Sequence, residues 1–142
     1  MISIIDAAKY IVFLSHNKKK GYLDQLVLQK ILYLAQGWSF VWDNKPLFNE
    51  DFEAWQFGPA NREVYFYFRQ YGRGEIPSCE GLELVDREAK DSLYVVWNEY
   101  YRYSTYDLAK LTFLQQPFQK ALLTHDTITK EDIKSYFRST YQ

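Results

Sequence analysis

Apolar side chains recur at helical spacing along most of the chain, and the clearest stripe lies in residues 24–42. Asp24 is placed to cap the start of this helix. Its stripe, three or four positions apart, consists of Leu28, Ile31, Leu32, Ala35, Trp38 and Trp42, and Tyr33, Leu34 and Val41 widen it. Because apolar residues almost surround the segment, we predict that it is the central helix. Its uncharged run, residues 31–42, is shorter than the roughly 20 residues that cross a bilayer.

Capping patterns mark other helix starts. Ser3 with Asp6, Ser104 with Asp107 and Thr129 with Asp132 each place a hydroxyl three residues before a carboxylate. Together with apolar spacing, they predict helices over residues 4–17, 59–71, 86–103, 104–116 and from 129 onward, with a further short helix from Pro117. Lys18, Lys19, Lys20 and Gly21 follow the first helix, and such a run is typical of a helix end; a cationic binding patch is the alternative.

A short β element is predicted after the central helix. Asn44, Pro46 and Asn49 break the helical pattern, and side chains alternate from Phe48 to Phe57. The alternation places Phe52, Ala54 and Gln56 on one face and Glu53, Trp55 and Phe57 on the other. We expect Gly58-Pro59 to close the strand and open the third helix, whose core positions would be Val64, Tyr67, Phe68 and Tyr71. A short strand at 82–85 is also expected.

The fold class that follows is mostly α: one compact domain, residues 1–142, of about six helices with a small β hairpin or short antiparallel element after the second helix. The 142 residues carry 17 Lys and Arg against 18 Asp and Glu, which gives a net charge of −1. This charge creates no strong electrostatic field that would attract a polyanion, so we do not expect nucleic-acid binding. One cysteine and no apolar leader predict a cytoplasmic protein without a membrane anchor. Aromatic residues make up 19% of the chain, enough to serve both a core and an interaction surface.

Few residues are placed for catalysis or metal binding. His16, Cys79 and His125 are too far apart in sequence to indicate a metal site, and no nucleophile motif surrounds Cys79. We therefore expect no catalytic residue, no metal and no cofactor, and a protein that is not an enzyme.

Two alternatives stay open. The first is a hydrolase with an unrecognised acidic site, because three carboxylates, Glu50, Asp51 and Glu53, lie near Trp55 in the sequence. The second is a DNA-binding helix-turn-helix protein that regulates its own operon, because the last helix carries the basic residues Lys130, Lys134 and Arg138.

Four sequence blocks follow one another in a specific order. They are LQKILYLAQGW at 28–38, PLF at 46–48, FEAWQFGP at 52–59 and the pair Val64-Tyr65. In order and spacing, residues 24–76 resemble the Panacea domain family, which comprises SocA-like bacterial proteins associated with phages and toxins. The C-terminal half resembles the family less closely: Phe113 stands where the family often has His, and Pro117-Phe118 where it often has Pro-Trp.

The resemblance implies an antitoxin: a protein-binding module that neutralises a cognate toxin by direct binding. It also implies that the toxin is encoded by an adjacent gene and that an ATP-dependent protease can be a further partner. Aromatic residues with nearby arginine dominate interface hot spots. The predicted partner-binding residues are therefore Phe48, Phe52, Trp55, Phe57, Arg62 and Tyr65. The alternative for Trp55 and Phe57 is packing beneath the third helix.

Overall fold

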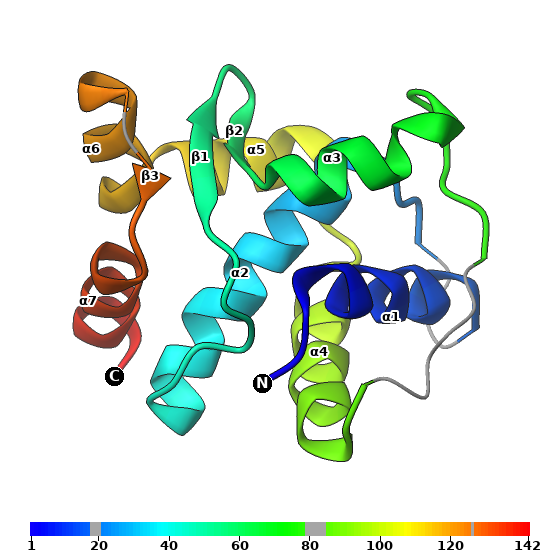
Figure 1. The fold of residues 1–142 in the computed structure, drawn as a ribbon, viewed down its shortest axis with the longest axis horizontal. Helices are drawn as coiled ribbons and strands as arrows, with labels where there is room; N and C mark the ends of the chain where they lie inside the picture. Colours follow the sequence, from blue (N-terminus) through cyan, green and yellow to red (C-terminus); the bar gives the residue numbers. More distant parts are fainter. Residues whose placement is uncertain (18–20, 79–84, 126) are drawn as a thin grey trace.

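The computed structural model describes residues 1–17, 21–78, 85–125 and 127–142 (Figure 1). The elements in these residues are α1 (Ile4–Asn17), α2 (Gln25–Asp43), β1 (Phe52–Trp55), β2 (Gly58–Ala60), α3 (Arg62–Phe68), the 3-10 helix η1 (Arg69–Tyr71), α4 (Arg87–Tyr100), α5 (Thr105–Phe113), α6 (Gln116–Thr124), β3 (Thr127–Ile128) and α7 (Lys130–Tyr141). The prediction of a mostly helical fold is confirmed, with seven α-helices in these residues against the about six expected.

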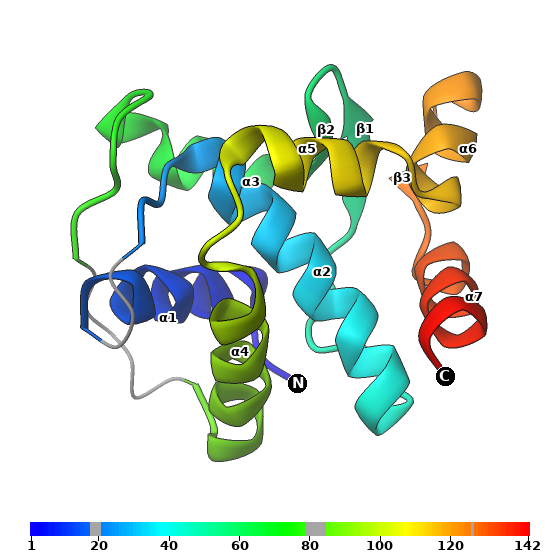
Figure 2. The ribbon, with the colours of Figure 1, turned by 180° about the vertical axis from the view of Figure 1, so that it is seen from behind.

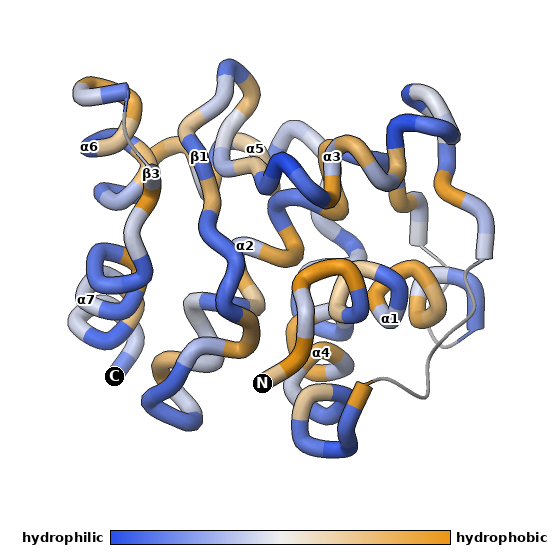
Figure 3. Tube along the Cα trace, in the orientation of Figure 1, coloured by the Kyte–Doolittle hydropathy of each residue, from blue (hydrophilic) through white to orange (hydrophobic). Residues whose placement is uncertain are grey.

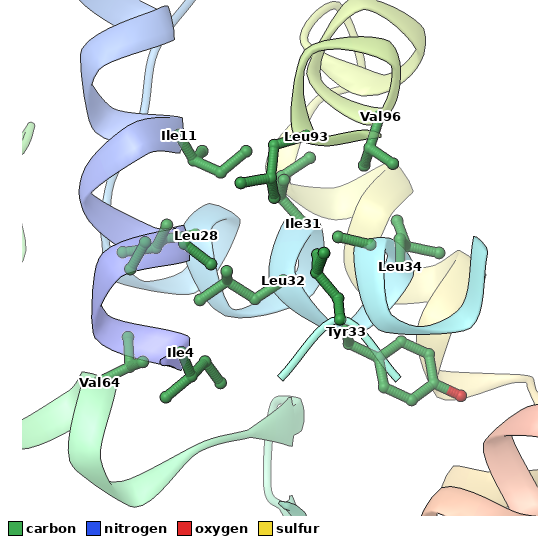
Figure 4. Close-up of a cluster of buried hydrophobic side chains, with 14 of the residues drawn as sticks. Ile4, Ile11, Leu28, Ile31, Leu32, Tyr33, Leu34, Val64, Leu93 and Val96 are labelled. Atoms are coloured by element: carbon green, nitrogen blue, oxygen red, sulfur yellow. The ribbon is translucent and has the colours of Figure 1, made fainter. Parts of the chain in front are cut away.

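Helix α2 is the central element. The Asp24 side chain caps it by accepting a hydrogen bond from the Val27 amide, and the helix then crosses the middle of the molecule (Figures 1 and 2). It contacts α1, α4, α5 and α7, so that most of its surface is covered. Figure 4 shows α2 side chains such as Ile31 meeting those of α1, α3 and α4 in one cluster. The apolar stripe in the sequence therefore predicted the position of this helix correctly.

The outer helices bury fewer residues. α7 buries only Ile133 and Phe137, whereas α1 buries eight residues, and Figure 3 shows α7 as mostly hydrophilic and α1 as largely hydrophobic. The predicted caps Ser104 and Thr129 each accept a hydrogen bond from a first-turn amide, and so does Asp86, at the predicted start of α4. Helix α4 ends at Tyr100, three residues earlier than the sequence pattern predicted.

The small sheet has the strand order β2-β1-β3 and is antiparallel throughout. β1 pairs with β2 through Ala54 opposite Pro59, and with β3 through Phe52 opposite Ile128. The hairpin follows α2 as predicted, although β1 is shorter than the alternation from Phe48 to Phe57 indicated.

Two predictions about the third helix are wrong. Gly58 and Pro59 lie in β2 and do not open the helix, because the Asn61 side chain supplies the cap by accepting from the Val64 amide. Tyr67 is exposed and outside the core, since the helix buries only Val64 and Phe68.

Two further predictions fall outside the described residues: the Lys18–Lys20 run and most of the short strand at 82–85. In the residues that the structure describes, no helix is both long enough and apolar enough to cross a membrane.

Candidate functional site

Buried polar side chains of α2 hold the segment that carries the hairpin. The Gln36 amide nitrogen donates to the Phe48 carbonyl oxygen at 2.9 Å, and its amide oxygen accepts from the Leu47 backbone nitrogen at 2.8 Å. Gln36 is fully buried, so these bonds satisfy backbone groups that water does not reach. One glutamine thereby joins the first and second sequence blocks.

Gln29 makes the equivalent connection at the end of the hairpin. Its oxygen accepts from the Asn61 backbone nitrogen at 2.7 Å, and its nitrogen donates to the Asn61 carbonyl at 3.1 Å. Because Asn61 also caps α3, this glutamine positions the hairpin and the following helix together.

Lys30 lies beneath the hairpin as a buried ammonium group. Only 3% of the residue is exposed, and its Nζ donates to the Pro59 carbonyl oxygen at 3.3 Å. Burial lowers the pKa of Lys30 to about 8, an effect that the Asp24 carboxylate partly opposes. Gly58 lies directly over this side chain, and a Cβ at position 58 would come within 2.8 Å of the lysine Cε. The backbone φ of Gly58 is +116°, a conformation that favours glycine.

The outer side of the hairpin and α3 carries an aromatic surface, which we define as Trp55, Phe57, Arg62, Tyr65 and Phe66. Phe57 is 60% exposed, Phe66 48% and Tyr65 38%. The Trp55 and Tyr65 rings meet edge to face with centroids 5.3 Å apart, and Tyr65 meets Phe66 in the same way at 5.5 Å. Exposed rings in contact with one another present a preformed apolar area to a partner.

A carboxylate fixes the polar edge of the aromatic surface. The Arg62 guanidinium donates two hydrogen bonds to Glu53, at 2.9 and 3.3 Å, and lies 5.9 Å from the Trp55 ring centroid. The Trp55 indole nitrogen donates to the same carboxylate at 3.1 Å. These hydrogen bonds, chiefly those from Arg62, hold the pKa of Glu53 below its usual value. Glu53 thus restricts the orientation of Arg62 and Trp55.

Phe57, at the tip of the hairpin, separates two hollows. The first hollow has a volume of about 110 Å³ and lies between the hairpin and the start of α2. Its lining includes Leu26, Trp55 and Tyr65. The other, of about 320 Å³, lies against α5 and is lined by Gln56, Phe57, Tyr106, Ala109, Lys110, Phe113 and Leu114. The exposed apolar area therefore continues from α3 across the hairpin tip to α5.

The structure divides the six predicted partner-binding residues into two groups. Trp55, Phe57, Arg62 and Tyr65 lie together on the outer face. Phe48 and Phe52 are fully buried, with ring centroids 5.9 Å apart, and Phe52 also packs against Tyr33. These two phenylalanines fill the core beneath the hairpin, so their prediction as direct contact residues is corrected.

Phe57 is too exposed to be packed beneath the third helix, which was the alternative for this side chain. Trp55 is half-buried and contacts Tyr65 of that helix. The sequence analysis missed Phe66, Tyr106 and Phe113, because a helical stripe indicates which residues are buried and not which exposed residues gather.

The three acidic residues behind the hydrolase alternative have separate structural partners. Glu50 accepts from the Ile4 amide at 3.2 Å, Asp51 pairs with Lys130 at 2.7 Å, and Glu53 pairs with Arg62. Each carboxylate is held by a different element, so the geometry gives no support to a shared acid–base site.

The helix-turn-helix alternative is not favoured either. Strand β3 lies between α6 and α7 and pairs with β1, in place of a short turn. Lys130 is engaged by Asp51, and Arg138 donates to Asn44.

The two histidines have structural roles. His16 Nε2 lies 2.8 Å from the Ile76 carbonyl oxygen, and His125 ends α6 with a φ of 57°. Cys79 lies outside the described residues. Across the described part of the chain, no three His, Cys, Asp or Glu side chains group as a metal site.

Comparison with known proteins agrees with this geometry. The sequence model of the family described as "Antitoxin SocA-like, Panacea domain" matches residues 28–118, which include the hairpin, α3, α5 and the hollow against α5. The chain belongs to this family. The antitoxin SocA of Caulobacter vibrioides (strain NA1000 / CB15N) is 46% identical over 50 residues, which cover 35% of this chain and 27% of SocA. The match thus spans little more than a quarter of that relative. No solved structure matches the chain significantly.

Proposed function

We propose that this Panacea-domain protein is an antitoxin that neutralises a cognate protein toxin by binding it directly. The observation that carries the proposal is the aromatic surface, which lies within the family-matched segment and is held in place by buried side chains of α2. The toxin is the product of an adjacent gene, and the complex forms in the cytoplasm. The protein acts as a binding module and has no catalytic step of its own.

The chemistry of the surface fits a protein partner. Tyr, Trp and Arg are enriched among residues that dominate binding energy, and here Trp55 contacts both Arg62 and Tyr65. The hydrogen bonds that Arg62 and Trp55 donate to Glu53 restrict both side chains before binding, so less conformational entropy is lost when a partner docks. The hollow on each side of Phe57 can accept apolar side chains from the partner.

Growth rescue tests the proposal. The adjacent reading frame is expressed in a bacterial host alone, with this protein, and with the Phe57→Ala and Trp55→Ala variants. We expect the neighbour to arrest growth, the wild-type protein to restore it, and both variants to restore it poorly, because each removes an exposed aromatic anchor. Tyr94→Ala is the matched control, since Tyr94 is 40% exposed on α4 and does not belong to the aromatic surface. A harmless neighbour, or full rescue by both variants, contradicts the proposal.

Delivery of the toxin to an ATP-dependent protease is a separate part of the proposal. We expect the half-life of the toxin in cells to shorten when this protein is present, and the shortening to disappear in a host without that protease. An unchanged half-life together with restored growth means that masking alone neutralises the toxin.

A further inference from the structure

A third hollow lies over the C-terminal half of α2. Figure 2 shows that this part of the helix passes between α4 and α7. The hollow has a volume of about 290 Å³ and is lined by Trp38, Trp42, Val95, Val96, Glu99 and Tyr100. The two tryptophans come from α2 and the other four residues from α4. The residues of the aromatic surface do not contribute to it.

The rings of this hollow are held in fixed positions. Trp38 and Trp42 stack with centroids 5.5 Å apart and planes 23° from parallel. The Trp38 indole nitrogen donates to the Tyr100 hydroxyl at 2.9 Å, and Tyr141 of α7 packs on Trp38 at 4.8 Å. Trp42 remains 43% exposed. A partner therefore meets aromatic faces that are already arranged.

Charge distinguishes this hollow from the two beside the hairpin. Glu99 is the one charged residue that lines it, whereas Lys30 and Lys110 line the others. None of the ion pairs among the described residues includes Glu99, and its side chain is exposed. Burial raises the pKa of Tyr100 to about 12, and the nearby Glu99 carboxylate adds to this effect. The hollow thus combines negative ring faces with an unpaired negative charge.

We propose that this hollow binds a basic side chain of a partner protein, with arginine as the best fit. Cations are attracted to the faces of Trp and Tyr rings, and a planar guanidinium can stack on a ring while it pairs with a carboxylate. A polypeptide fits better than a free cation, because the exposed sides of Trp42 and of Val95, 51% exposed, are apolar area that flanking residues would cover. The inference does not depend on the proposed antitoxin activity.

Nuclear magnetic resonance of the four tryptophan indole groups provides a direct test. The 15N-labelled protein is titrated with a blocked Gly-Arg-Gly peptide, with the same peptide carrying citrulline in place of arginine, and with methylguanidinium as the free cation. We expect the arginine peptide to shift the Trp38 and Trp42 indole signals to saturation and to leave those of Trp55 and Trp97 in place. We expect citrulline to cause no shift, and methylguanidinium to bind more weakly than the arginine peptide.

Two substitutions make the test specific. Glu99→Gln removes the charge at an exposed position and is expected to weaken binding of the peptide roughly two- to fivefold, in the range for an exposed ion pair. Glu131→Gln, at an exposed carboxylate of α7 outside the hollow, is the matched control and should change nothing. Equal binding of the citrulline peptide, unmoved Trp38 and Trp42 signals, or an unchanged affinity in Glu99→Gln would overturn the inference. Methylguanidinium binding as tightly as the peptide would overturn the choice of a protein-borne cation.

Discussion

A single buried ammonium group makes the stability of this protein depend on pH. The pKa of Lys30 falls from 10.5 to about 8 on folding, so between these values the unfolded chain binds more protons than the folded protein. The free energy of unfolding must therefore rise with pH in this window. Denaturant unfolding at pH 7 and pH 9.5 should show a gain of about 2 kcal/mol.

Lys30→Met is the control for this prediction. It keeps the volume of the side chain but has no proton to lose, so the gain between pH 7 and pH 9.5 should disappear. A variant that keeps the full gain would show that another group causes it. The pKa values of the buried tyrosines Tyr33 and Tyr100 are raised above 10, so these residues reduce stability only at still higher pH.

At the residue scale, alternation in the sequence showed that Phe52 and Phe57 lie on opposite faces of the hairpin, but not which face is outward. The hydrogen bonds from α2 decide this question, and the α2 side chains that donate them lie 12 to 32 residues away in sequence from the carbonyl groups that accept them. Lys30 itself carried no sign of burial, because a lysine within an apolar stripe usually extends to solvent.

At the scale of elements, the connection between α2 and the chain after it depends on Gln36. Replacing Gln36 with leucine leaves the Leu47 amide and the Phe48 carbonyl buried without partners. We expect a loss of about 2–4 kcal/mol in the free energy of unfolding, measured with urea. Gln116→Leu, at an exposed position of α6, should stay within about 0.5 kcal/mol of wild type. Equal stability of the two variants would contradict this role for Gln36.

The contact between α2 and α7 requires a small residue at position 37. A Cβ on Gly37 would come within 2.4 Å of the Phe137 ring, so Gly37→Ala forces α7 outward. Although alanine favours a helix, we expect a net loss of about 1–3 kcal/mol in unfolding free energy from overpacking. Gly74→Ala has open space around its Cβ and should be near neutral in the same thermal or urea unfolding measurement. A Gly37→Ala protein as stable as wild type would mean that α7 is not fixed against α2.

Local signals predicted the helices well, because caps such as Ser104 and Thr129 act within one turn. Elements that depend on distant partners were harder to predict. Strand β3 has two residues and exists through its pairing with β1, far away in sequence. The start of α3 was misplaced because Pro59 is also compatible with a helix start, whereas Asn61 provides the cap.

At the scale of the whole molecule, the family blocks and the fold support each other. The block at 28–38 contributes Gln29, Lys30 and Gln36. Lys30 and Gln36 form hydrogen bonds with backbone groups of the other blocks, and Gln29 does so with the backbone just after the block at 52–59. Much of what identifies the family in the sequence is therefore the internal framework that presents the aromatic surface. The identity of the partner is not encoded in that framework, since one scaffold can present different surfaces.

The central claim is that the aromatic surface binds the product of the adjacent gene. The most direct test is calorimetric titration of that product into the purified wild-type protein and its Phe57→Ala and Tyr94→Ala variants, with circular dichroism to confirm folding. We predict a Kd about 30-fold weaker for Phe57→Ala, equivalent to about 2 kcal/mol for a hot-spot residue, and an unchanged Kd for Tyr94→Ala. Absence of binding by the wild-type protein, or equal Kd values for all three proteins, would contradict the claim.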